Sequence, residues 1–171
     1  AHAIAARERM QMLSSLRLAF SADRLFLVYQ PFVDLASGRI IGAEALLRWR
    51  TDQNEFVPPD RFIPLAEQSG LMVPIGDWLT RCALQFLKRL QDLGHHNFRM
   101  AINVSHTQFR EPDFVEKLTE AIADCEVNAA NVELELTESV AIDNIELIDK
   151  KVSAVRAKGV AIAIDDFGTG Y

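Results

Sequence analysis

Five oxygen-bearing side chains stand at or near the ends of predicted β-strands and could together hold divalent cations. They are Glu44, Asn103, Glu135, Asp165 and Asp166. Carboxylate and amide oxygens are the ligands that Mg²⁺ and Mn²⁺ prefer. Two such ions about 3.5–4 Å apart, bridged by Asp165, would activate a shared water and stabilise an in-line attack on phosphorus. These residue types therefore favour metal-dependent hydrolysis of a phosphate ester.

Some of these residues also have simpler explanations. Asp165 and Asp166 follow a short apolar run and could merely solubilise a turn. Glu44 lies inside an otherwise apolar segment, where a carboxylate needs a partner because an isolated buried charge is costly. Arg48 could be that partner in a purely structural ion pair, or it could be available for a phosphate oxygen. The metal hypothesis rests on the number of strand ends that carry such oxygens, not on any one residue.

The hydrophobic pattern predicts the elements that would position these side chains. Short apolar runs alternate with amphipathic helical segments that begin near Pro or end at Gly. Strands are predicted over 25–30, 39–49, 98–105 and 131–138, and a fifth strand runs from Val160 to the acidic pair. Helices are predicted over 3–20, 59–67 and 73–93, from Pro112, and from about Asn144, with a loop over 52–60. The first two strands form a hairpin, and the rest predicts a parallel α/β fold.

A parallel fold would gather the polar strand ends. The carboxyl ends of parallel strands meet at the crevice where ligands bind. In the strand over 131–138, strict alternation places Leu134 and Leu136 on one face and Glu133 and Glu135 on the other. In a barrel, Glu135 would then point inward near the top layer.

The opening helix over 3–20 has apolar residues near heptad spacing and no start signal. It is either a linker helix that continues from an upstream part of a longer polypeptide or a helix packed on its own domain. We expect residues 1–20 to be such a linker and residues 21–171 to be the catalytic-type domain.

Composition narrows the function classes. The chain of 171 residues has 18 basic and 24 acidic residues, which gives no support to binding of nucleic-acid polymers. No apolar run approaches the ~18 residues of a membrane span, and the N-terminus lacks the apolar core of a signal peptide. Cys82 and Cys125 have no pairing motif. Two free thiols are typical of the reducing cytoplasm, which is the predicted location of this domain, whether the parent protein is free or anchored to a membrane through other regions.

Two short motifs at the C-terminal end are set aside. Asp166-Phe167-Gly168 spells the metal triplet of protein kinases, but no Gly-rich loop or His-Arg-Asp loop precedes it. Gly168-x-Gly170 is not a dinucleotide fingerprint, because no helix follows it in this sequence. A phospho-acceptor domain of the receiver type would place its acidic pair after an early strand rather than a late one.

Six motifs, in order, resemble those of the EAL domain of bacterial cyclic di-GMP phosphodiesterases. They are Tyr29-Gln30-Pro31, Glu44-Ala45-Leu46-Leu47-Arg48-Trp49, Phe62-Ile63-Pro64-Leu65-Ala66-Glu67, Asn103-Val104-Ser105, Glu135-Leu136-Thr137-Glu138-Ser139 and Asp165-Asp166-Phe167-Gly168-Thr169-Gly170-Tyr171. The resemblance runs from about Leu25 to Tyr171 and implies a modified (β/α)8 TIM-type barrel. This chain would cover about the first five strands.

The resemblance also implies roles for individual residues. The first metal ion would be bound by Glu44, Asn103, Glu135 and Asp165, and the second by Asp165 and Asp166. Gln30 and Arg48 match positions that contact the cyclic dinucleotide. Glu138 matches a residue that holds the loop after Asp166, a loop tied to dimerisation and activity. Among these residues, Glu44, Asp165 and Asp166 are the expected catalytic ones.

The reaction implied is hydrolysis of cyclic di-GMP to linear pGpG, with two Mg²⁺ or Mn²⁺ ions. The family's catalytic lysine and a further metal-binding glutamate lie beyond Tyr171, so this chain alone is expected to be inactive. The alternative is an inactive EAL domain that binds cyclic di-GMP as a sensor. The resemblance further implies a homodimer and an upstream sensory or GGDEF-type domain in the parent protein.

Overall fold

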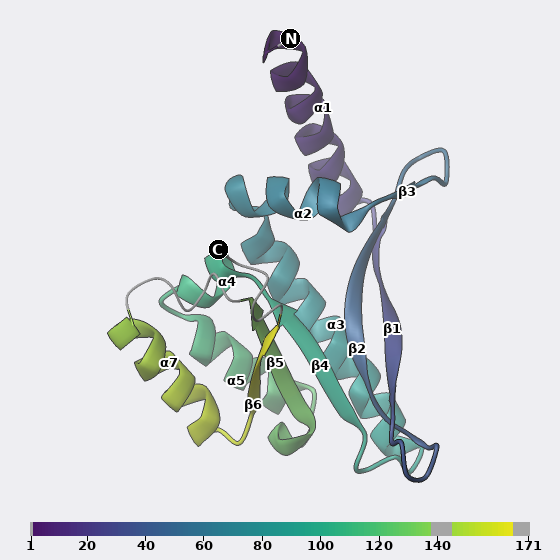
Figure 1. The fold of residues 1–171 in the computed structure, drawn as a ribbon, viewed down its shortest axis with the longest axis vertical. Helices are drawn as coiled ribbons and strands as arrows, with labels where there is room; N and C mark the ends of the chain where they lie inside the picture. The colour runs from purple at the N-terminus through teal and green to yellow at the C-terminus, as the bar shows by residue number, and fades with distance from the viewer. Residues whose placement is uncertain (1, 138–144, 166–171) are drawn as a thin grey trace.

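A twisted sheet backed by helices forms the body of the molecule, and a long helix projects from it (Figure 1). The computed structural model describes residues 2–137 and 145–165. The strands are β1 (Leu25–Val33), β2 (Ile40–Arg50), β3 (Phe56–Val57), β4 (Arg99–Val104), β5 (Val132–Thr137) and β6 (Ala161–Asp165). The helices are α1 (His2–Ser21), α2 (Pro59–Gln68), α3 (Met72–Asp92), α4 (His106–Arg110), α5 (Phe114–Asp124), the 3₁₀ turn η1 (Ala129–Asn131) and α7 (Ile145–Ala157).

The sheet has the strand order β1-β2-β4-β5-β6, with the short β3 paired to β2. β1 and β2 form an antiparallel hairpin. β2, β4, β5 and β6 are parallel to one another. The predicted hairpin and the parallel α/β arrangement after it are therefore confirmed. Within the described residues the sheet does not close on itself, and β1 and β6 are its edges.

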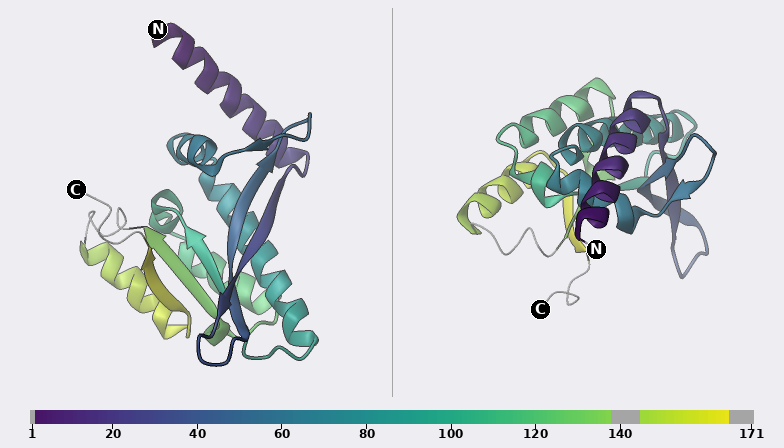
Figure 2. Two further views of the ribbon diagram at one scale, coloured as in Figure 1. Left: turned by 45° about the vertical axis from the view of Figure 1, so that its right-hand side comes forward. Right: turned by 90° about the horizontal axis from the view of Figure 1, so that it is seen from above.

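Helices cover one face of this sheet. Successive side chains of a strand point to opposite faces, so every second residue faces the helices. Those residues are buried and apolar, as Ala45 in β2 and Ile102 in β4 illustrate. α3 packs against β1 and β4, α7 packs against β6, and α5 contacts both α3 and α7 (Figure 2). The opposite face carries Glu44, Asn103 and Glu135, which are only partly buried.

In the motif Tyr29-Gln30-Pro31, adjacent residues point to opposite faces of the sheet, one packed against helices and the other carrying the predicted ligands. Tyr29 points to the helical face, where its ring stacks on Phe86 of α3 with centroids 4.0 Å apart. Burial there, with a smaller contribution from Cys82, raises the pKa of Tyr29 to about 12. Gln30 is paired with Glu44 and therefore lies on the other face.

The first strand is longer than predicted. We predicted that it stops before Pro31, but β1 continues through Val33. β1 is an edge strand, and proline is tolerated at an edge because its missing N–H can face away from the ladder.

Two short elements were missed. Ser105, predicted to be in a strand, instead caps α4: its hydroxyl accepts a 3.1 Å hydrogen bond from the backbone N–H of Gln108. β3 lies inside the predicted loop over 52–60 and pairs with the end of β2. The prediction for α3 is confirmed to within one residue at each end. Gly94, at φ 98°, follows its last turn.

α1 combines features of both interpretations offered for it. Leu16 and Ala19 are buried, and the helix contacts α2. Residues 6–11 are exposed, and that half of the helix extends away from the body (Figure 1). The linker role of residues 1–20 remains a prediction. Among the described residues, no helix combines the length and apolar character needed to span a membrane.

Candidate metal centre

Strand register brings the predicted metal ligands to neighbouring positions. Asn103 of β4 is paired with Glu135 of β5, and adjacent strands lie about 4.8 Å apart. Glu44 of β2 is paired with Ala101, two residues before Asn103. Since residues two apart on a strand share a face, Glu44, Asn103 and Glu135 all lie on the face without helices. The sheet thus places three of the predicted ligands together.

A short hydrogen bond joins two of these side chains. The amide Nδ2 of Asn103 donates to Oε1 of Glu44 at 2.6 Å. This contact supplies the partner that the half-buried Glu44 requires. Because the amide nitrogen faces Glu44, the amide oxygen is the atom that Asn103 can offer to a cation.

The ion pair between Glu44 and Arg48, one of the two interpretations of Glu44, is wrong for the described structure. Arg48 Nη1 donates to its neighbour's carbonyl, that of Leu47, at 2.8 Å. Arg48 shares the face of Glu44, four residues further along β2. Gln30, on β1, is paired directly with Glu44. Both predicted substrate contacts therefore lie on the same face as the predicted ligands.

The last predicted ligands are only partly within the described chain. Asp165 is the final residue of β6 and is paired with Thr137. That pair lies two residues beyond the pair of Glu135 and Ala163, toward the carboxyl ends of the strands. Asp166 and Glu138 lie outside the described residues, so their predicted roles remain predictions.

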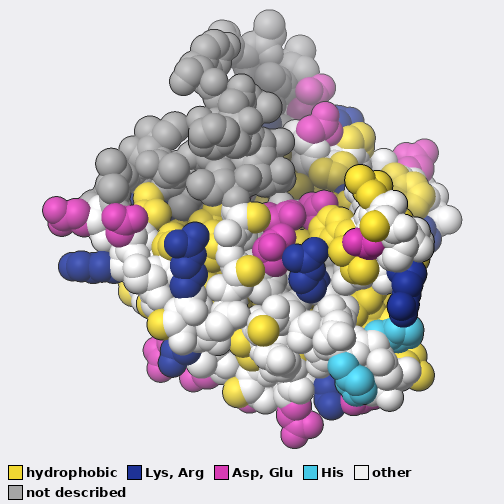
Figure 3. Space-filling view, turned by 60° about the horizontal axis from the view of Figure 1, so that its bottom comes forward, with side chains coloured by type: hydrophobic (Ala, Val, Ile, Leu, Met, Phe, Trp, Pro, Cys, Tyr) yellow, Lys and Arg dark blue, Asp and Glu magenta, His cyan; other side chains and the backbone are white. Residues whose placement is uncertain are grey.

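The donor set fits a hard divalent cation, although it is incomplete in the described residues. No group of three or more His, Cys, Asp or Glu side chains is placed there to hold a metal ion. The candidate ligands whose side chains the structure describes are two carboxylates, Glu44 and Glu135, and one amide, Asn103. Oxygen ligands of these kinds suit Mg²⁺ or Mn²⁺ rather than the softer metals. Figure 3 shows acidic, basic and hydrophobic side chains interspersed on the face seen when the bottom of Figure 1 is turned forward.

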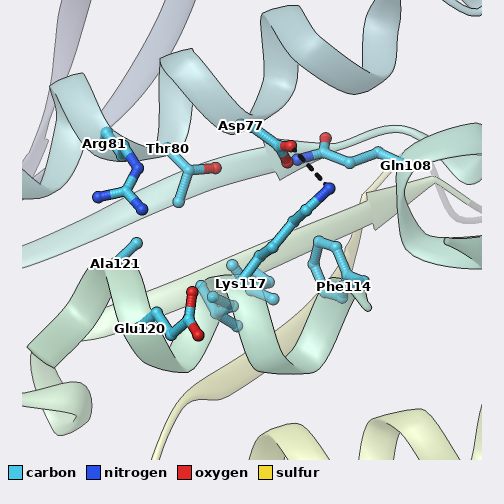
Figure 4. A pocket seen from close by; sticks show the side chains of 10 residues that line it. Asp77, Thr80, Arg81, Gln108, Phe114, Lys117, Glu120 and Ala121 are labelled. Atoms are coloured by element: carbon cyan, nitrogen blue, oxygen red, sulfur yellow. Dashed lines mark ion pairs between the residues drawn. The ribbon is translucent and has the colours of Figure 1, made fainter. Parts of the chain in front are cut away.

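A separate pocket of about 240 Å³ lies between α3 and α5, on the helical side (Figure 4). Three of the charged side chains that line it form ion pairs: Lys117 Nζ lies 3.3 Å from Asp77 and 3.0 Å from Asp113, and Arg81 lies 3.0 Å from Asp124. None of the predicted site residues lines it. We interpret it as a groove between packed helices, with no part in the chemistry.

The sequence analysis missed a second cavity, of about 360 Å³, at the carboxyl end of β2. Phe26 and Arg50 are among its lining residues. The alternation of β2 could have indicated it, because Arg48 and Arg50 are two residues apart and share a face. Phe56, whose ring contacts Phe26 and Arg50, comes from β3, which was not predicted.

The placement of Glu44, Asn103 and Glu135 agrees with the resemblance to the EAL domain. A comparison with family sequence profiles establishes whether the chain belongs to that family. The sequence profile of the EAL domain matches residues 13–171.

The chain belongs to the EAL family.

Curated relatives point the same way. The chain is 39% identical over 166 residues to the bifunctional diguanylate cyclase/cyclic di-GMP phosphodiesterase MucR of Pseudomonas aeruginosa, covering 97% of this chain and 24% of MucR. It is 37% identical over 168 residues to the cyclic di-GMP phosphodiesterase NbdA of the same organism, covering 98% of this chain and 22% of NbdA.

Solved structures confirm the fold. The phosphodiesterase of MucR in complex with cyclic di-GMP superposes with a TM-score of 0.89 at 38% identity, covering 94% of this chain and 65% of that one. The EAL enzyme Bd1971, bound to cAMP and cyclic di-GMP, gives a TM-score of 0.92 at 36% identity, covering 98% of this chain and 46% of that one. The described sheet is therefore a partial TIM-like barrel. The chain spans about a quarter of the curated relatives' length.

Proposed function

We propose that this chain forms the first part of a metal-dependent phosphodiesterase domain that hydrolyses cyclic di-GMP to linear pGpG. The observation that carries the proposal is the joint placement of Glu44, Asn103 and Glu135 on neighbouring parallel strands, with Asn103 hydrogen-bonded to Glu44 at 2.6 Å. Relatives named as cyclic di-GMP phosphodiesterases, and a relative solved with cyclic di-GMP, support the substrate.

The proposed roles follow from the chemistry of each group. Glu44, Asn103 and Glu135, with Asp165 and Asp166, would hold two Mg²⁺ or Mn²⁺ ions through oxygen atoms. When bound, such ions polarise a phosphoryl oxygen and lower the pKa of a bound water. Asn103 has a second role that needs no metal, because its Nδ2 fixes the position of the Glu44 carboxylate.

Two further residues would bind the substrate. Arg48 carries a guanidinium on the same face as Glu44, and guanidinium groups match phosphate oxygens in charge and geometry. Gln30, exposed on β1 opposite Glu44, can donate and accept hydrogen bonds. Together they would orient one phosphodiester of the ring over the carboxylates.

Several features of the parent protein belong to the same proposal. We infer that it works as a cytoplasmic homodimer, with Glu138 holding the loop after Asp166 at the subunit contact. We also infer an upstream sensory or GGDEF-type domain, which the exposed half of α1 would join to this one. MucR is itself named as a bifunctional cyclase and phosphodiesterase, which supports that arrangement.

The test is hydrolysis of cyclic di-GMP by protein that carries the whole barrel, in Mg²⁺ or Mn²⁺, with separation of the linear product. We expect Glu44→Gln to reduce turnover by at least about 100-fold, because it removes a carboxylate that holds the metal. Glu133→Gln is the matched control: Glu133 lies on the same face of β5, two residues before Glu135, and we expect nearly normal turnover.

Two outcomes would contradict the proposal in different ways. Normal turnover by Glu44→Gln would rule out the proposed metal centre. Tight binding of cyclic di-GMP by the wild type without any linear product would instead favour the alternative, an EAL domain that senses the dinucleotide.

A further inference from the structure

The guanidinium of Arg50 lies over two neighbouring aromatic rings. Its guanidinium carbon lies 5.2 Å from the ring centroid of Phe26 and 4.7 Å from that of Phe56. The two rings also contact each other, with centroids 6.2 Å apart and an interplanar angle of 59°. Two cation–π contacts hold the guanidinium in one orientation.

No acceptor within the described residues forms a hydrogen bond with the guanidinium of Arg50. Arg50 Nε is buried without a hydrogen-bond acceptor. Within the described residues Arg50 forms no ion pair, in contrast to the nearby Arg24, which pairs with Asp52. The Nη groups of Arg50 also have no hydrogen-bond partner among the described residues, and unlike Nε they are not buried, so they can donate to an acceptor from outside the chain.

The cavity beside Arg50 is open to solvent and is large enough for a planar base. Its volume is about 360 Å³, within the range of roughly 300–1,000 Å³ that is common for ligand pockets. Besides Phe26 and Arg50, it is lined by Asp23, whose carboxylate forms no ion pair with a described residue. The cavity therefore combines an aromatic ring, an unpaired cation and an unpaired anion.

This combination matches guanine better than adenine. Guanine presents two acceptors, O6 and N7, which an arginine fork can contact with two hydrogen bonds. Its Watson–Crick edge carries N–H donors, from which a carboxylate can accept hydrogen bonds. Adenine has an amino group in place of O6, so a guanidinium there would face a donor.

The cavity also lies within reach of the proposed phosphodiester site. Phe26 is paired with Arg48, so the ring beside Arg50 lies on the same face of the sheet as Arg48, the proposed phosphate contact. Arg50 follows Arg48 by two residues, which is about 7 Å along a strand. A dinucleotide with one phosphate at Arg48 could place a base at Arg50.

We propose that Arg50, held over the rings of Phe26 and Phe56, binds a guanine base of the substrate and gives the site its preference for guanine over adenine. This inference rests on the proposed function, because it concerns the base of the same cyclic dinucleotide. Arg50 is a specificity-determining residue in this proposal, not a catalytic one.

The test compares the affinities for cyclic di-GMP and cyclic di-AMP, measured by calorimetry on protein that carries the whole barrel, in EDTA to prevent turnover. We expect Arg50→Met to lower the preference for cyclic di-GMP by about 5- to 150-fold, the usual range for a bidentate contact to a guanine. Arg50→Lys keeps the charge but loses the planar fork, and we expect it to lose most of the preference as well.

Two further variants complete the test: one is a control for the loss of an arginine elsewhere on this face, and the other removes a ring that contacts Arg50. Arg99→Met removes an exposed arginine from the same face at the opposite end of the sheet, and the preference should not change. Phe56→Ala removes a ring that is 62% exposed, so the core stays intact; we expect a loss of preference in the same direction as for Arg50→Met.

Each remaining outcome is informative. An unchanged preference in Arg50→Met overturns this inference, and so does an equal loss of affinity for both dinucleotides, which would indicate a phosphate contact. In either case a wild type that still hydrolyses cyclic di-GMP leaves the proposed function intact. A wild type that binds neither dinucleotide overturns both proposals.

Discussion

Replacing Asn103 by Asp turns the hydrogen bond to Glu44 into a contact between two carboxyl groups. The variant loses a hydrogen bond to a charged group, which is worth about 1.5–3 kcal/mol. At the present separation of 2.6 Å, two carboxylates would also repel each other. Two charges about 3 Å apart interact with about 5.5 kcal/mol at an effective dielectric constant of about 20.

Proton uptake limits that cost. At pH 7, protonating a carboxyl with an ordinary pKa of about 4.3 requires about 3.7 kcal/mol, so the repulsion cannot exceed this value. A protonated pair also regains a hydrogen bond, and solvent screens the half-buried groups. We therefore expect Asn103→Asp to lower the free energy of unfolding of the metal-free protein by about 2–4 kcal/mol at pH 7.

The pH dependence gives the prediction its sign. A carboxyl whose pKa is raised by folding destabilises the protein only where the unfolded chain would be ionised. The deficit should therefore shrink as the pH falls from 7 toward about 4. Mn²⁺ should also reduce the deficit, because a cation between the carboxylates cancels the repulsion and binds only the folded state.

Urea denaturation followed by circular dichroism, at pH 7 and pH 4.5 and with EDTA or Mn²⁺, measures these differences. Asn97→Asp is the control, since it adds the same charge at an exposed position. A deficit that does not depend on pH, or one no larger than that of Asn97→Asp, would refute the account of the Glu44–Asn103 pair.

Two further predictions concern packing around the sheet. A Cβ added at Gly42 would lie 2.6 Å from the carbonyl oxygen of Arg99, so Gly42→Ala should lower the free energy of unfolding by about 1–3 kcal/mol in urea denaturation; an unchanged value would mean that β2 and β4 can separate freely there. Burial raises the pKa of Tyr29 to about 12, so the neutral phenol is favoured in the folded state and the associated stability should be lost as the pH rises from 10 through 12. In an absorbance titration, the wild type should show an ionisation step near pH 12 that is absent from Tyr29→Phe. A wild-type step near pH 10 that is absent from Tyr29→Phe would contradict the prediction.

The order of the elements could be predicted from the sequence because local signals agree with the fold. Alternation in residues 131–138 placed Leu134 and Glu135 on opposite faces of the strand, and the structure confirms this. Gly94 marked the end of the longest helix. Such signals depend on neighbouring residues and need no knowledge of the rest of the chain.

The features that were predicted wrongly or missed depend on contacts between distant segments of the chain. Pro31 interrupts a central strand but not an edge strand, and only the sheet order shows that β1 is an edge. The sequence offered Arg48 or a metal ion as the partner of Glu44, and the hydrogen bond from Asn103 was not predicted. The pairing of β2 with β4 brings Asn103 to Glu44, while Arg48 turns to the Leu47 carbonyl. The cluster around Arg50 includes Phe56 from a strand of two residues, which is too short to have a periodicity.

The most direct test of the central claim is a Mn²⁺ binding titration of protein that carries the whole barrel, followed by electron paramagnetic resonance. The account predicts binding that is lost or weakened at least about 10-fold in Glu44→Gln and in Glu135→Gln, and that is unchanged in Glu133→Gln. Equal binding by all four proteins would contradict the claim that Glu44 and Glu135 share one metal centre.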